Sequence, residues 1–183
     1  MIPKMTNPLS VEHLLRVREI YRTLRHERED LFGGLPFSMS WLRIRYLKRG
    51  SIRTMASASF DPPTLSIHRD AFDYNHPIVL RGLIHHELIH FILGPDVGHS
   101  RLFSTCEREW CEWDDYRYHR GKFVRLIEEH ARSAGRLHRY ECPNCFIVLL
   151  RTREMKPESA CSECCESFND GVWSESYILR CAD

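Results

Sequence analysis

Four of the eight cysteines form two CxxC pairs, and these pairs restrict what the C-terminal part of the chain can become. Fifteen residues separate Cys145 from Cys161, which is a spacing typical of a structural zinc site with four thiolate ligands. Such a site is tetrahedral and closed, because four protein ligands leave no position for a substrate. We therefore predict one structural zinc ion, in a zinc ribbon formed by residues 139–183. Its ligands are Cys142, Cys145, Cys161 and Cys164.

The other cysteines carry weaker signals. Cys165 directly follows Cys164 and is an alternative fourth ligand, whereas Cys181 has no predicted role. Cys106 and Cys111 lie outside any pairing motif and are expected to be small buried apolar side chains. The N-terminal residues lack the apolar core of a signal peptide, and the longest strongly apolar run, residues 146–150, is far shorter than a membrane span. We expect a cytoplasmic protein, nucleoid-associated or nuclear if it acts on DNA, in which paired cysteines bind metal.

The second strong signal is the sequence HHELIH at residues 85–90, which contains the pattern HExxH. Residues four apart lie on the same face of a helix, so the imidazoles of His86 and His90 can bind one metal ion. Glu87 can instead face a water molecule at that ion and act as a general base. These positions predict a catalytic zinc centre with Glu87 as its catalytic residue.

A catalytic zinc ion needs a third protein ligand and one open position. Eight residues separate His90 from His99, and a turn after Gly94 could return His99 to the ion, so His99 is the favoured third ligand. His85 faces about 100° away from His86 on a helix and is not expected to bind the ion. Three glutamates on the following helix are alternative ligands: Glu107, Glu109 and Glu112.

Two further roles at this centre stay open in the sequence. An aspartate is expected to accept the second N–H of a ligating imidazole, and an additional donor is expected to stabilise the oxyanion of the reaction. The candidates for the first role are Asp96, Asp114 and Asp115, and those for the second are Tyr116, Tyr118, His119 or an arginine.

The order of periodic segments predicts an α+β fold. Helical spacing is found in residues 8–30, 77–93, 100–113 and 122–134, whereas residues 38–72 contain short β-like segments. Breaks at Gly50 and at Asp61 suggest three strands joined by tight turns in a small, mostly antiparallel sheet. In the ribbon, strands are expected over residues 146–150 and 175–179. After Gly135 the helical spacing ends and the cysteine pairs follow, and we place a domain boundary between residues 138 and 139.

Charge is unevenly distributed, although the net charge is only +1. Residues 1–60 carry 11 Lys or Arg and 5 Asp or Glu, so this part is basic. Basic residues interleaved with aromatic ones suit backbone contact and base stacking, while a solvated surface is the simpler interpretation. The candidate nucleic-acid contacts are Arg43, Arg45, Lys48, Arg49 and Arg53 near residue 46, and Arg136, Arg139, Arg151 and Arg153 near the ribbon.

These motifs, in this order, resemble the SprT-like zinc metallopeptidase family (bacterial SprT and Spartan-like proteases). The resemblance runs from about residue 8 to the C-terminus, and it rests on the HExxH segment, Gly98-His99 with Phe103, and the two CxxC pairs. It implies a zincin-like helical core over a small sheet in residues 1–138, with a C-terminal ribbon. It also implies His86, His90 and His99 as zinc ligands and Glu87 as the catalytic acid. The doubled Cys164-Cys165 departs from the usual glycine after such a pair.

Two functions follow from these motifs. The first is a zinc-dependent endopeptidase acting on proteins, among them DNA-associated or DNA-crosslinked proteins, as in DNA–protein crosslink repair. The alternative is a non-proteolytic zinc-containing DNA-binding module. Glu87 favours the enzyme, because a binding module needs no base beside its metal. The expected cofactors are one catalytic and one structural Zn²⁺. The expected partners are a protein substrate and DNA, single-stranded rather than double-stranded, and no membrane.

Overall fold

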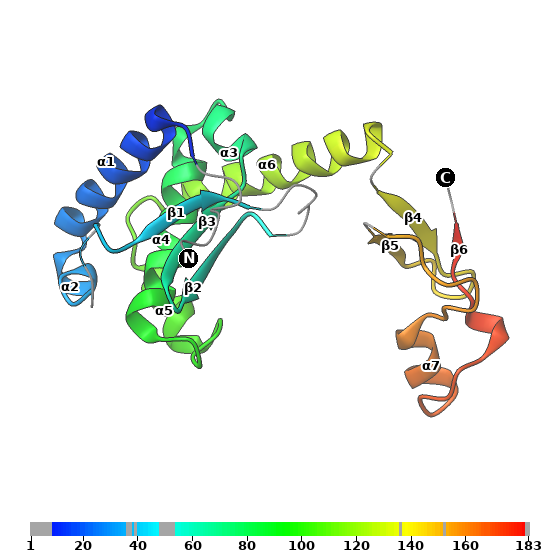
Figure 1. Cartoon of the computed structure of the whole chain (residues 1–183). Helices are drawn as coiled ribbons and strands as arrows, with labels where there is room; N and C mark the ends of the chain where they lie inside the picture. The colour runs from blue at the N-terminus through cyan, green and yellow to red at the C-terminus, as the bar shows by residue number, and fades with distance from the viewer. Residues whose placement is uncertain are drawn as a thin grey trace, which may run out of the picture. The chain divides into compact units, whose positions relative to one another are not determined.

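The computed structural model describes residues 9–35, 38, 40–47, 54–135, 137–151 and 153–181. The chain is a mixed α+β protein with two small sheets, and it forms two compact units, Met1–Leu126 and Ile127–Asp183. Figure 1 shows the helices and strands of both units in chain order. No helix of the described ranges is long and apolar enough to cross a membrane.

The first unit begins with two helices, α1 (Val11–Glu27) and α2 (Glu29–Phe32). Ser10 caps α1, because its hydroxyl oxygen accepts a hydrogen bond from the His13 N–H at 3.2 Å. One face of α1 is buried through Val17, Tyr21 and Leu24, as its helical spacing predicts. Arg28 joins the two helices.

The first sheet contains β1 (Arg43–Tyr46), β2 (Ala56–Phe60) and β3 (Pro63–Ile67), in the order β1-β3-β2. The β2–β3 pair is antiparallel, with Ala58 opposite Leu65. The β1–β3 pair is parallel, so the prediction of a mostly antiparallel sheet is wrong for this pair. The reason is the strand order: β1 lies on the far side of β3 and reaches it by a crossover instead of a hairpin. The predicted turn at Gly50 lies outside the described residues.

The short helix α3 (Asp70–Asp73) leads to the central helix α4 (Pro77–Leu93), which contacts β2 and the helices α1, α2, α3 and α5 (Figure 1). Because α4 has neighbours on several sides, it is apolar on several faces. Gly82 allows a further close approach to α4. A Cβ atom at this position would lie 2.1 Å from Cδ2 of Tyr116, which belongs to a later helix, so only glycine fits here.

Two helices complete this part of the chain, α5 (Arg101–Arg108) and α6 (Trp113–Ser133). Ser100 caps α5 by accepting a hydrogen bond from the Phe103 N–H at 3.3 Å. The division between the two units falls inside α6, after Leu126, whereas the sequence places a boundary at residues 138–139. The change in residue pattern after Gly135 coincides with the end of α6 and not with the division between the two units. The last turns of α6 belong to the second unit, and Ile127 and Ala131 on these turns are buried.

The second unit contains β4 (His138–Glu141), β5 (Val148–Arg151), α7 (Ser162–Phe168), η1 (Glu175–Tyr177) and β6 (Arg180–Cys181). The strand order is β5-β4-β6 and both pairs are antiparallel. The predicted strand at residues 175–179 is a 3₁₀ turn followed by the bridge residue Ile178, which pairs with Ala160. A strand is formed only afterwards, by Arg180 and Cys181, where the chain reaches the edge of β4.

Candidate metal centres

The structure brings His86, His90 and His99 together. Their ligand nitrogens all lie within 4.8 Å of one another, and Nε2 of His99 is 3.1 Å from Nε2 of His86. His86 and His90 come from successive turns of α4, which is the geometry that the HExxH spacing predicts. These three imidazoles can hold one divalent metal ion, and nitrogen ligands of this kind are consistent with zinc.

His99 reaches this group by way of a turn. Gly94 ends α4 with a φ of 88°, and Gly98 precedes His99 with a φ of 53°. Both angles lie in the left-handed region that glycine adopts without strain. The chain therefore reverses direction between α4 and α5 and returns His99 to the face that carries His86.

Phe103 underlies all three imidazoles. Its ring centroid is 4.8 Å from that of His86, 4.4 Å from that of His90 and 4.9 Å from that of His99. The ring is fully buried, whereas His99 is exposed and the other two histidines are partly exposed. The group is therefore closed by an apolar ring on its inner side and open to solvent on its outer side.

Glu107 has a role that the sequence did not assign. Its Oε1 lies 2.6 Å from Nδ1 of His86, and because an ionised carboxylate only accepts, Nδ1 is the donor. This contact leaves Nε2 of His86 free to bind an ion. The sequence placed Glu107 among the alternative third ligands and expected an aspartate in this supporting role. The spacing in the sequence could have indicated this role, because Phe103 and Glu107 are four residues apart and therefore lie on the same face of a helix.

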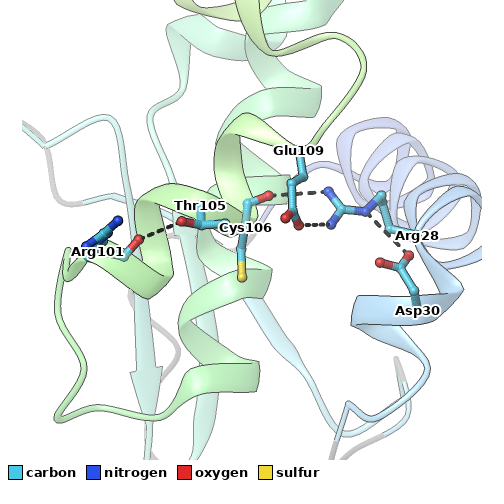
Figure 2. Close-up of polar contacts among 6 residues, drawn as sticks. All are labelled: Arg28, Asp30, Arg101, Thr105, Cys106 and Glu109. Atoms are coloured by element: carbon cyan, nitrogen blue, oxygen red, sulfur yellow. Dashed lines mark hydrogen bonds and ion pairs between the residues drawn. The ribbon is translucent and has the colours of Figure 1, made fainter.

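The other two glutamates considered as ligands are engaged elsewhere. Glu109 Oε2 lies 3.5 Å from Nη2 of Arg28, a contact that Figure 2 shows beside the end of α5. Glu112 Oε2 lies 3.1 Å from Nε of Arg81. Neither belongs to the group of side chains that can share an ion with His86.

Glu87 is buried beside the three histidines, with 4% of its surface exposed. Burial disfavours the charged carboxylate and raises the pKa of Glu87 to about 7. The neighbouring His86 and a hydrogen bond from the backbone N–H of Ala58 act in the opposite direction, while Glu107 raises the pKa further. A carboxyl group with a pKa near neutrality is suited to accepting and releasing a proton at physiological pH.

His85, next to the ligand His86, faces the core. Its ring stacks on Trp110 at a centroid distance of 4.5 Å and meets Phe32 edge-on at 5.3 Å. Burial, and secondly the charge of Arg28, lower the pKa of His85 to about 3. His85 is therefore a neutral core residue and, as expected from its helical angle, not a member of the metal group.

The candidates for an oxyanion donor lie in different surroundings. Tyr116 is buried against Gly82, and this burial raises the pKa of its hydroxyl above the ordinary value. Tyr118 is exposed, and His119 stacks on His76 at 3.6 Å while its Nε2 lies 3.4 Å from Oδ1 of Asp115. Asp115, a predicted partner of a ligating imidazole, is thus paired with His119.

The four predicted cysteines of the second unit also come together, with all sulfur atoms within 4.8 Å of one another. Sγ of Cys142 lies 3.6 Å from Sγ of Cys164, and Sγ of Cys145 lies 3.8 Å from Sγ of Cys161. Four thiolates in this arrangement can bind one metal ion and are consistent with zinc. Cys165 is buried but is not part of this group.

The two CxxC pairs reach this arrangement in different ways. Cys142 and Cys145 flank a turn, as predicted, but Cys161 is the N-cap of α7 and Cys164 lies in its first turn. Burial alone would raise the pKa of Cys142, yet backbone N–H groups of Cys145 and Asn144 lower it to about 7. Such donors stabilise the thiolate that a metal ion requires.

The remaining cysteines differ from the prediction in one case. Cys106 is buried, as expected, and burial raises its pKa. Cys111 is exposed, because it lies in the turn between α5 and α6 and not on a packed helix face. Cys181 lies on the edge strand β6 and is exposed.

The predicted nucleic-acid contacts fall into three sets. Arg43 and Arg45 are exposed on the same face of β1, and Nε of Arg45 donates to the Ser66 hydroxyl at 3.1 Å. Arg139 and Arg151 lie on opposite faces of the second sheet, because Arg139 pairs with Leu150 and His138 pairs with Arg151. Arg153 is exposed after β5. Four predicted contacts lie outside the described residues: Lys48, Arg49, Arg53 and Arg136.

Comparison with models of known protein families and with curated proteins finds no match to this chain.

Proposed function

We propose that this chain is a zinc-dependent endopeptidase of the SprT-like type, with its catalytic centre at the three histidines of the first unit. The observation that carries the proposal is the position of Glu87. This carboxyl group is buried one residue from His86, beside three imidazoles that can share one ion and that are open to solvent on their outer side. A site that served only to stabilise the fold would need no carboxyl group there and would be closed by a fourth ligand.

The residues of the chain would divide the reaction between them. A zinc ion on three neutral imidazoles supplies Lewis acidity and activates water for nucleophilic attack. Glu87 would take a proton from the attacking water, hold it on a carboxylate oxygen and pass it to the leaving amine nitrogen as the C–N bond breaks. Glu107 would keep the Nε2 atom of His86 directed at the ion.

The position of β2 supports a polypeptide substrate. Among the described strands, β2 lies at an edge of the first sheet, and the Ala58 N–H on this strand donates a hydrogen bond to Glu87. An edge strand can pair with an extended peptide through main-chain hydrogen bonds. A peptide bound along β2 would therefore pass close to Glu87, which suits an endopeptidase better than an enzyme for small molecules.

The second unit would have a supporting role. Its four cysteines form a complete ligand set, three of them buried, so a zinc ion there would stabilise the ribbon without taking part in chemistry. Contact with DNA belongs to the same proposal only as a modulating interaction. Arg43 and Arg45 project from one face of β1, and the highly exposed Trp41 lies in the turn just before this strand, which suits contact with a single-stranded phosphate backbone.

The test is proteolysis of an unfolded protein by the zinc-loaded chain, with and without single-stranded DNA. Glu87→Gln should retain zinc at the histidines and lose turnover by about 10²-fold or more, because it cannot accept a proton. Glu129→Gln, an exposed glutamate on α6, is the matched control and should cleave normally. Equal cleavage by Glu87→Gln and the unaltered chain would contradict the proposal. Cleavage that increases with DNA would support DNA-associated substrates.

A further inference from the structure

Arg28 connects the first two helices with the helix that supports the metal group. It is the one buried arginine or lysine of the described ranges, with 9% of its surface exposed. A buried guanidinium is costly unless charged or polar partners surround it. Figure 2 shows its side chain extending from the α1–α2 junction to the C-terminal end of α5, where the partners of its fork lie.

Both ends of this connection are fixed. The backbone of Arg28 belongs to both helices, because its N–H donates to Leu24 O at 2.9 Å and its carbonyl accepts from the Phe32 N–H at 2.7 Å. At the other end, Nη1 donates to Cys106 O at 3.3 Å and Nη2 lies 3.5 Å from Glu109 Oε2. Nε lies 3.4 Å from Oδ1 of Asp30.

The carbonyl of Cys106 is one that α5 leaves available. Its helical partner would be the N–H of Trp110, but that group donates to Glu107 O at 3.2 Å as the helix ends. Free carbonyls at a helix C-terminus carry partial negative charge and favour a nearby cation. Arg28 therefore stabilises the last turn of α5, while Ser100 caps the first turn.

The segment held between these two ends is the part that touches the histidines. An isolated helix of eight residues is not stable in water, so the position of α5 depends on tertiary contacts such as these. Glu107 directly follows Cys106 in the chain, and its carboxylate lies 2.6 Å from Nδ1 of His86. A shift of the last turn of α5 would move this carboxylate first.

We infer that Arg28 is a positioning residue of the metal centre: by fixing the C-terminal turn of α5 it holds Glu107 against His86. The inference rests on the metal centre of the proposed function but not on peptide hydrolysis. It is therefore tested by metal binding alone, and a chain that binds metal without cleaving peptides would refute the peptidase and leave this inference standing.

The experiment measures Co²⁺ affinity of the full chain at the histidine centre by competition with a chelator. Cobalt on thiolates shows sulfur-to-metal charge transfer and cobalt on imidazoles does not, so the cysteine centre serves as an internal reference. Arg28→Met should weaken binding at the histidines about tenfold, the size of effect expected when a supporting contact of a ligand is lost. Arg16→Met is the matched control. Like Arg28, Arg16 donates to a carbonyl that is distant in the sequence. This carbonyl belongs to Phe72, at 2.7 Å, and lies outside α5.

A double-variant cycle with Glu107→Gln separates positioning from general destabilisation. If Arg28 acts through Glu107, the double variant should bind Co²⁺ no more weakly than Glu107→Gln alone. Unchanged affinity in Arg28→Met, an equal loss in Arg16→Met, or a full additional tenfold loss in the double variant would each overturn the inference. If Arg28→Met does not fold, Arg28→Lys replaces it in the cycle, because a lysine keeps the charge but cannot contact Cys106 and Glu109 with one fork.

Discussion

The two metal groups of this chain are built on opposite principles. In the first unit, His86 and His90 project from a 17-residue helix whose other faces are already buried in an apolar core. In the second unit, Cys142, Cys161 and Cys164 are themselves core residues, packed with Tyr140 and Leu179. The histidine group lies beside an apolar core to which it does not belong, whereas the cysteine group makes up much of the core of the second unit.

The two ligand sets also differ in their exposure to solvent. Two of the histidines are partly exposed and His99 is exposed, and three ligands leave room for a fourth, exchangeable one. Three of the four cysteines are buried, and together they complete a tetrahedral set. In this chain, the ligand set suited to chemistry lies at the edge of an apolar core, while the ligand set suited to stability forms part of the core itself.

The largest expected effect is that of metal removal. If both units responded alike, the proposed difference between the two metal groups would be wrong. Treatment of the full chain with a strong chelator should unfold the second unit, because structural zinc supplies about 10 kcal/mol to small domains of this type. The first unit should remain folded. Amide hydrogen exchange can follow both units in one sample, and protection should disappear in residues 138–181 and persist in α4. Continued protection of β4 without metal would contradict the assignment of Cys142, Cys161 and Cys164 to the core of the second unit.

Gly82→Ala tests the packing of the first unit. The new methyl group would meet the ring of Tyr116, and a clash of this kind in a rigid core costs about 3 kcal/mol. Chemical denaturation followed by tryptophan fluorescence would report the loss. Gly121→Ala on α6 is the matched control, since nothing lies within 4 Å of its added Cβ, and it should gain about 0.5–1 kcal/mol. Similar results for the two variants would show that α4 and α6 do not approach as described.

Glu107→Gln sharpens the difference between the two ligand sets. The amide cannot stabilise His86 as the carboxylate does, so zinc affinity at the histidines should fall about tenfold, or about 1.4 kcal/mol, without an effect on the cysteines. Competition with a chelator measures both sites. Glu112→Gln, which alters a contact with Arg81 and not with His86, should bind zinc like the unaltered chain. A loss at the cysteine site would argue against separate centres.

The smallest effect is expected at Phe146, which has a φ of 58° and is 70% exposed directly after Cys145. Glycine adopts this conformation without strain, so Phe146→Gly should stabilise the zinc-loaded second unit by about 1 kcal/mol. Phe168→Gly removes a similarly exposed ring from helix α7 and should instead destabilise it. Thermal unfolding of the two variants decides whether the backbone angle or the lost ring governs the result.

Local patterns predicted the groups that depend on spacing. The i, i+4 relation placed His86 and His90 on one face, and the CxxC pairs identified the four cysteines, because these relations hold within a turn of backbone. The periodic segments likewise predicted a mixed α+β chain with small sheets. The contact between Glu107 and His86 could not be derived in this way, since it depends on how α5 packs against α4.

The same limit explains the errors. The parallel pairing of β1 with β3 depends on which edge of the hairpin the first strand reaches, and alternation within β1 contains no information about its partner. Residues 177–179 have strand-like composition, but the 3₁₀ turn at Glu175–Tyr177, the bridge between Ala160 and Ile178 and the position of β6 are set by the rest of the ribbon. Cys111 resembles a core residue by type, and only the turn after Trp110 exposes it.

The place of His99 has a consequence for the speed of ion exchange. His86 and His90 are held by one helix, whereas the third ligand, His99, lies on an exposed turn between Gly98 and α5. The two ligands on α4 would therefore bind an ion with a spacing fixed by the helix, and His99 on its separate turn would complete the set. Stiffening this turn in the conformation described should therefore slow the departure of an ion more than its arrival.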